Sequence, residues 1–164
     1  MPHFHEDYEV VLVEDGKANI SINGNSFFIA ENQAIFINSS EIHSITSSRN
    51  SLIYVLKLSN QHFGGFLDHK KFARRVLNHE YFTLDLLCNI KNELAQMDKY
   101  SDKMILSMLS IVLMQMLRNE TVINENNNNS NHHFDGRDTL FFCVSPNLCL
   151  QTIIRLPSKM PQNI

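Results

Sequence analysis

Six short apolar runs in the first third of the chain, separated by polar turns, constrain the fold more than any other feature. In ANISI the apolar side chains alternate with polar ones, so they share one face of an extended strand. Asn23-Gly24 follows at once and favours a tight hairpin, because both residues tolerate positive φ. Short strands at this spacing are typical of a small barrel or sandwich. We predict strands within YEVVLVED, ANISI, SFFIA, AIFIN, HSIT and SLIYVLKLS.

From about Gln61 the spacing of the apolar residues changes to three and four, which is typical of helices. The third helical stretch, 101–118, begins with Ser101 or Asp102, either of which can accept the free backbone N–H groups of the first turn. Its polar stripe is narrow, so we expect it to pack on two sides, either between the barrel and another helix or against a second subunit. The apolar residues of the first two stretches include Leu67, Phe72, Val76, Leu87, Ile90, Leu94 and Met97.

This pattern divides the chain into four parts. We predict a barrel at 1–59, a helical dimerisation segment at 60–118, and a linker at 119–133 that is rich in asparagine and too polar to form a core. Residues 134–164 contain three prolines and no sustained period, which indicates an irregular or disordered tail.

Composition limits the class of protein. The 164 residues suffice for about one domain, and a hydrophobic fraction of 43% is normal for a globular chain. A net charge of -3 without a basic stripe provides no general attraction to nucleic acid. The three cysteines lack paired spacing, so we expect buried, reduced thiols rather than disulfides or a structural zinc site. With no signal peptide and no bilayer-spanning apolar run, we predict a cytoplasmic protein that contacts no membrane.

The N-terminal sequence HFHEDYE concentrates potential metal ligands. Residues two apart in a strand point the same way, so His3, His5 and Glu9 share one face. His43 starts a later strand, from which it can lie across the barrel from the other three. Imidazoles and a carboxylate suit zinc, nickel, iron, manganese or copper, with positions left open for water or a small ligand. The same four residues also suit a polar pocket without metal.

Two segments resemble the cupin motifs. HFHEDYEVVLVEDG matches the first motif, HxHxxxExxxxxxG, at each of its fixed positions, which are His3, His5, Glu9 and Gly16. ENQAIFINSSEIH is similar to the second motif in length and in its final His43, but Asn32 stands where the family has glycine and residues 38–40 replace the usual proline and glycine. The resemblance implies a mainly β fold with some α: a small cupin barrel (double-stranded β-helix), followed by two or three helices, with the site inside the barrel.

In the order of its parts the chain resembles the N-terminal sensor domain of AraC-type transcription regulators. Such domains place dimerising helices and a linker after a cupin barrel. The resemblance implies a domain that senses an effector and dimerises, rather than an enzyme. We expect a small molecule, such as a sugar, in the barrel and a homodimer through the 101–118 helix. The expected ligand-binding residues are His3, His5, Glu9, Val11, Val13, Phe36, His43 and Tyr54, and no residue is assigned a catalytic role.

These regulators end in a DNA-binding domain with two helix-turn-helix units, and nothing after His133 resembles it. We therefore expect a truncated regulator that does not bind DNA specifically by itself, with DNA as the partner of a full-length regulator.

Two other interpretations remain. A free-standing metal-dependent cupin enzyme, an isomerase or oxygenase, would use His3, His5, Glu9 and His43 as metal ligands. A frayed N-terminal strand would hold His3 poorly, which argues against that interpretation. A nonfunctional gene fragment would explain residues 134–164 but not the barrel.

Overall fold

The computed structural model of the chain describes residues 2–48, 50–67, 70–78, 80–96, 98–124, 142–145 and 148–154. All six strands predicted in the first third are confirmed. They are β1 (Tyr8–Asp15), β2 (Lys17–Ile22), β3 (Asn25–Ala30), β4 (Gln33–Ile37), β5 (His43–Ser47) and β6 (Leu52–Leu58).

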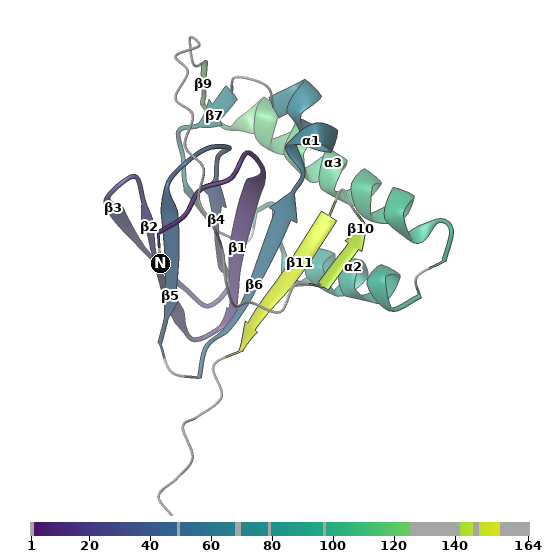
Figure 1. The fold of residues 1–164 in the computed structure, drawn as a ribbon, viewed down its shortest axis with the longest axis horizontal. Coiled ribbons are helices and arrows are strands. Elements are labelled where there is room, and N and C mark those ends of the chain that lie inside the picture. The colour runs from purple at the N-terminus through teal and green to yellow at the C-terminus, as the bar shows by residue number, and fades with distance from the viewer. Residues whose placement is uncertain are drawn as a thin grey trace, which may run out of the picture.

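Later in the chain the described residues form β7 (Lys70–Phe72), β8 (Val76–Asn78), β9 (Val122–Asn124), β10 (Phe142–Ser145) and β11 (Leu148–Ile154). Within the described residues, two antiparallel sheets build the barrel. The larger has the strand order β10-β11-β6-β1-β4-β8, and the smaller has the order β3-β2-β5. Figure 1 shows the smaller sheet on one side of β1, β4 and β6 and the helices on the other side.

Positive φ angles explain the turns. Asn23 and Gly24, with φ of 49° and 83°, join β2 to β3 as the dipeptide predicts. Asn32, at the position of a cupin glycine, has φ of 62°, a conformation that asparagine tolerates better than most residues. Gly16 has φ of 85°, and a Cβ there would collide with the side chain of Ser51. Asn32 therefore adopts a left-handed conformation that glycine also adopts readily.

After β6 the described residues form three helices: α1 (Asn60–Leu67), α2 (Leu84–Gln96) and α3 (Ser101–Asn119). The helical spacing through Phe72 and Val76 is misleading, because α1 ends at Leu67. Phe72 pairs with Val122 across β7 and β9, and Val76 pairs with Ile35 across β8 and β4. Backbone partners far away in the chain outweigh the local pattern there. Met97, the last apolar residue expected in the second stretch, lies outside the described residues.

The N-terminal cap of α3 also differs from the prediction. Ser101 is the first helical residue, and its N–H donates to Oδ1 of Asp98 over 3.0 Å. The same carboxylate accepts from the N–H of Tyr100 over 2.7 Å. Asp98, before the helix, therefore performs the role expected of Ser101 or Asp102.

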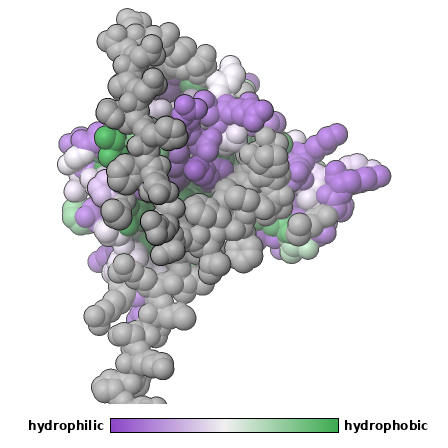
Figure 2. All heavy atoms as spheres, viewed as in Figure 1, coloured by the Kyte–Doolittle hydropathy of each residue, from purple (hydrophilic) through white to green (hydrophobic). Residues whose placement is uncertain are grey.

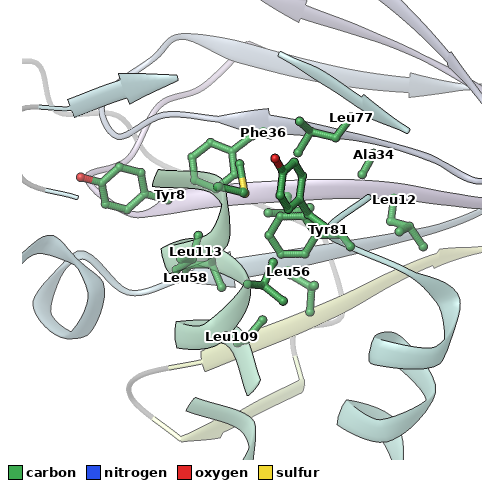
Figure 3. Close-up of a cluster of buried hydrophobic side chains, with 14 of the residues drawn as sticks. Tyr8, Leu12, Ala34, Phe36, Leu56, Leu58, Leu77, Tyr81, Leu109 and Leu113 are labelled. Carbon is green, nitrogen blue, oxygen red and sulfur yellow. The ribbon is translucent and has the colours of Figure 1, made fainter. Parts of the chain in front are cut away.

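The larger sheet separates two hydrophobic clusters. Val11 and Val13 face the smaller sheet, within an aliphatic cluster that fills the barrel. Val10 and Leu12, the intervening residues of β1, face the helices. Figure 3 shows this second cluster, in which Leu109 and Leu113 of α3 approach the sheet. The alternation of β1 thus decides which side chains can reach the barrel interior.

The C-terminal third contains more regular structure than predicted. β9 lies within the expected linker, and β10 and β11 lie within the tail expected to be irregular. β11 pairs with β6 along its whole length, from Leu148 opposite Leu58 to Ile154 opposite Leu52. The prediction of an irregular tail is therefore wrong for these two strands, because an edge of β6 supplies backbone partners. The described residues do not include 125–133 of the expected linker, nor 134–141, 146–147 and 155–164 of the expected tail.

The surface has two further features. Cys88 is a free thiol, as predicted, but it is exposed rather than buried. In Figure 2 the end of the molecule where α2 meets α3 is mostly hydrophilic. None of the helices in the described part of the chain has the length and apolarity needed to span a membrane.

Candidate functional site

The structure brings together the four residues that the sequence singles out. One potential ligand atom from each of His3, His5, Glu9 and His43 lies within 4.8 Å of the others. The ring centroids of His3 and His43 are 4.3 Å apart, and those of His5 and His43 are 5.1 Å apart. Glu9 lies in β1 of the larger sheet and His43 opens β5 of the smaller one. The cluster therefore joins the two sheets at one end of the barrel.

The N-terminal segment is held by β5. The N–H of His3 donates to the carbonyl of His43 over 2.9 Å, and the N–H of His43 donates back to His3 over 2.8 Å. The expectation that fraying leaves His3 poorly held is therefore wrong. Residues 6–7 form a bend, so His5 and Glu9 do not share one continuous strand as the alternation argument assumed. The bend, rather than the alternation of side chains along a strand, brings His5 next to Glu9.

Backbone carbonyls fix the orientation of two imidazoles. Nδ1 of His5 lies 2.9 Å from the carbonyl of Asp7, and Nδ1 of His43 lies 2.8 Å from the carbonyl of Glu41. A carbonyl only accepts hydrogen bonds, so Nδ1 carries the hydrogen in both rings. Their Nε2 atoms then face Oε2 of Glu9, at 2.8 Å for His5 and 3.6 Å for His43. Nε2 of His43 is buried and has no hydrogen-bond partner within the described structure.

The cluster holds a buried negative charge. Burial by itself would raise the pKa of Glu9, but the neighbouring His43 and His5 outweigh burial and lower this pKa to about 2. Burial would lower the pKa of His43, yet the Glu9 carboxylate raises it above the ordinary 6.5. The 3.6 Å separation exceeds a hydrogen bond, so we attribute this effect to attraction between opposite charges. The cluster therefore pairs an ionised carboxylate with an imidazole whose protonated form this carboxylate favours.

A second layer supports His43, and sequence reasoning missed it. Glu41 is buried, and both oxygens of its carboxylate accept hydrogen bonds from the guanidinium of Arg75. The N–H of Asn38 donates to the same carboxylate over 3.0 Å. The available signals were a glutamate two residues before His43 and a pair of arginines within an apolar stretch. Neither signal by itself indicates that Glu41 and Arg75 are partners.

The expected lining residues separate onto two faces. Val11 and Val13 lie in the barrel interior, on the side of the sheet that carries Glu9. Phe36 and Tyr54 belong to the cluster beneath the helices, so the prediction that they line the barrel interior is wrong. The register explains this: Ile35, not Phe36, is opposite Val11, and Tyr54 is opposite Leu12.

The donor set and its support fit a divalent transition metal. Imidazole and carboxylate are common ligands of zinc, nickel, iron and manganese. An imidazole whose other nitrogen donates to a carbonyl is the usual arrangement around such ions. Exposure falls from His3, which is exposed, through His5 to the buried Glu9 and His43. The cluster is therefore reached from the surface through His3.

Comparison with known proteins identifies the family. Among solved structures the chain is similar to apo ToxT K231A from Vibrio cholerae strain SCE256, with 14% sequence identity and a TM-score of 0.48. The similarity covers 71% of this chain and 49% of the ToxT chain, so the chain spans about half the length of that structure. Comparison with curated proteins finds no matching sequence. The family model of the AraC-like ligand-binding domain matches residues 1–121, which include strands β1 to β8, the cluster and the three described helices. The chain therefore belongs to the family of AraC-like ligand-binding domains.

Proposed function

We propose that this chain is the effector-sensing and dimerisation domain of an AraC-type transcription regulator, acting in the cytoplasm, and that the cluster forms the polar end of its effector site. The main support is the ionised Glu9 carboxylate, buried between His5 and His43 but reached from the surface through His3. A ligand that donates hydrogen bonds to an ionised carboxylate gains strong, charge-assisted contacts.

The chemistry of the cluster favours a small polyhydroxylated ligand, such as a sugar. Glu9 accepts hydrogen bonds, and the imidazoles can donate them from Nε2 when protonated. Below the cluster, Val11 and Val13 are completely buried among aliphatic side chains. We therefore place the effector at the cluster itself, above these packed valines.

Calorimetric titration of the purified chain with a panel of sugars and sugar acids tests this assignment. We expect a binder whose affinity falls at least about tenfold in Glu9→Gln, because hydrogen bonds to a charged group contribute about 1.5–3 kcal/mol. Glu6→Gln, at an exposed neighbour, is the matched control. Equal affinity of wild type and Glu9→Gln would refute the assignment.

Dimerisation through α3 is the second part of the proposal. Met104, Ile111 and Met114 are 49%, 60% and 39% exposed, although they lie on a helix whose other face is buried. Their spacings of seven and three match the a and d positions of a coiled coil. Large apolar side chains exposed in such a stripe indicate a surface that another helix covers.

The charge of Arg118 favours an antiparallel pair. Two α3 helices that cross at Ile111 would place Met104 of one helix opposite Arg118 of the other, since both lie seven residues from Ile111. A parallel pair would instead place Arg118 opposite Arg118, which is unfavourable. We expect Ile111→Glu to convert a dimer into a monomer in sedimentation velocity at roughly tens of micromolar. Asn92→Glu, exposed on α2, should stay dimeric. A monomeric wild type at that concentration would refute the dimer.

A divalent transition metal in the cluster is the second candidate, and the partnerless Nε2 of His43 favours it. His3, His5, Glu9 and His43 would hold the ion, which would act as a Lewis acid toward a bound ligand or, in the alternative of a metal-dependent isomerase or oxygenase, toward a substrate. We expect about one ion per chain after dialysis against zinc or nickel, and a loss in His5→Ala and Glu9→Ala. His62→Ala, at an exposed histidine, is the control. Metal content far below one ion per chain would refute this candidate.

In a full-length regulator, the effector signal would pass from the barrel to α3 and to a DNA-binding domain. The helices in the described part of this chain all lie within the match to the ligand-binding domain. We therefore expect no specific DNA binding by this chain in a gel-shift assay.

A further inference from the structure

Two consecutive arginines connect the cluster to the end of α3. Arg75 donates to both carboxylate oxygens of Glu41, the residue two positions before His43. Arg74 donates from Nη1 to Oε1 of Glu120, the first residue after α3, over 3.2 Å. Neighbouring guanidinium groups thus bind the barrel and the helix terminus separately.

On the barrel side of this connection, Glu41 is buried and held by several hydrogen bonds. Glu41 is 2% exposed, and its main-chain carbonyl accepts from Nδ1 of His43 over 2.8 Å. Its carboxylate is held by Asn38 as well as by Arg75. The carbonyl of Arg75 accepts from the N–H of Phe36 in β4 over 3.1 Å. The His43 ring, Glu41 and Arg75 are therefore joined by consecutive hydrogen bonds.

The helix side is equally well connected. The N–H of Ala73 donates to the carbonyl of Thr121 over 2.9 Å, and β7 pairs with β9 immediately beyond. The hydroxyl of Tyr81 donates to Glu120 over 2.9 Å, and the N–H of Glu120 donates to the carbonyl of Met116 in α3 over 2.8 Å. Segment 70–75 therefore joins the end of α3 and the strand that follows it.

Building on the proposed sensing function, we infer that Arg74 and Arg75 form a clasp that couples the position of His43 to the C-terminal end of α3. Arg75 is the positioning residue on the side of the cluster, and Arg74 is its counterpart on the side of the helix. A ligand that binds Nε2 of His43 displaces the ring, and the hydrogen bond from Nδ1 displaces the main-chain carbonyl of Glu41 with it. The ion pair between Glu41 and Arg75 transmits this displacement to segment 70–75. The signal thereby reaches β9, the strand that follows α3.

Amide hydrogen exchange on the full chain tests the clasp without any effector or metal. In buffer with a chelator, we expect His43→Gln to accelerate exchange at Ala73 and Glu120 by roughly 2- to 30-fold, the range for single substitutions in coupled networks. In an Arg75→Met background the same substitution should leave both amides unchanged. The amide of Asn32, bonded to the carbonyl of Val13, is the internal control. His62→Gln is the matched histidine control.

The reverse measurement does not require a folded His43 variant. Glu120→Gln should shift the ring proton signals of His43 in the NMR spectrum, and Arg75→Met should abolish that shift. Arg75→Lys keeps the charge but not the paired contact, so we expect partial coupling. Unchanged exchange at Ala73 and Glu120, or equal changes with and without Arg75, would overturn the clasp. A coupled chain that binds neither sugar nor metal would instead refute only the proposed function.

Discussion

The ionised Glu9 carboxylate makes a specific prediction about stability and pH. Its pKa of about 2, against 4.5 for a free glutamate, corresponds to about 3 kcal/mol of folding free energy at pH values above 4.5. Because the pKa is lower in the folded chain, this contribution is present above pH 4.5 and is lost as the pH falls toward 2.

His43 determines the upper end of the pH range over which the same charge pair stabilises the fold. Its pKa is raised above 6.5 in the folded chain, so its contribution is present below pH 6.5 and is lost as the pH rises through the folded value. The two contributions describe one charge pair and must not be added. The stabilisation from this pair is therefore largest between about pH 4.5 and 6.5.

Urea unfolding of wild type and Glu9→Gln, measured from pH 2 to 8 with a chelator present, checks this prediction. Glutamine retains the shape of the side chain but cannot ionise, so the two stability curves should differ by about 3 kcal/mol near pH 5.5 and converge toward pH 2. Other carboxylates titrate in both proteins, and the difference between the curves removes them. Glu6→Gln should follow wild type. A difference that stays constant down to pH 2 would refute the charge-pair explanation.

Three further changes probe the fold. Phe36→Ala should destabilise the chain by about 3–5 kcal/mol in urea unfolding without removing a ligand contact, because Phe36 packs against Phe72 on the face of the sheet that meets the helices; loss of effector affinity in folded protein would contradict this. Gly16→Ala should lower the free energy of unfolding by more than about 1 kcal/mol, because of the positive φ and the collision with Ser51. Gly65→Ala in α1 should leave this free energy unchanged or raise it. Equal effects of the two substitutions would count against strain at Gly16. Asp98→Ala should lower the free energy of unfolding by about 1 kcal/mol and accelerate amide exchange at Ser101, while Asp102→Ala should do neither. A larger effect of Asp102→Ala would instead support the helix cap expected from the sequence.

Local patterns were sufficient to predict much of this fold. The alternating runs and Asn23-Gly24 predict the strands of the barrel, and the spacing of three and four predicts α2 and α3. The two cupin-like segments also identify His3, His5, Glu9 and His43 as one group, which the structure brings within 4.8 Å. Each of these features depends on residues close together in the sequence.

Features that depend on register or on distant partners required the tertiary structure. A shift of one residue between β1 and β4 decides whether Ile35 or Phe36 faces the barrel, and no local pattern sets that register. Likewise, Arg75 pairs with a glutamate 34 residues away, and β11 pairs with β6, a strand much earlier in the sequence. The sequence by itself determined which residues could form the cluster. Only the packing of the two sheets and of segment 70–75 decided what surrounds the cluster and how it connects to α3.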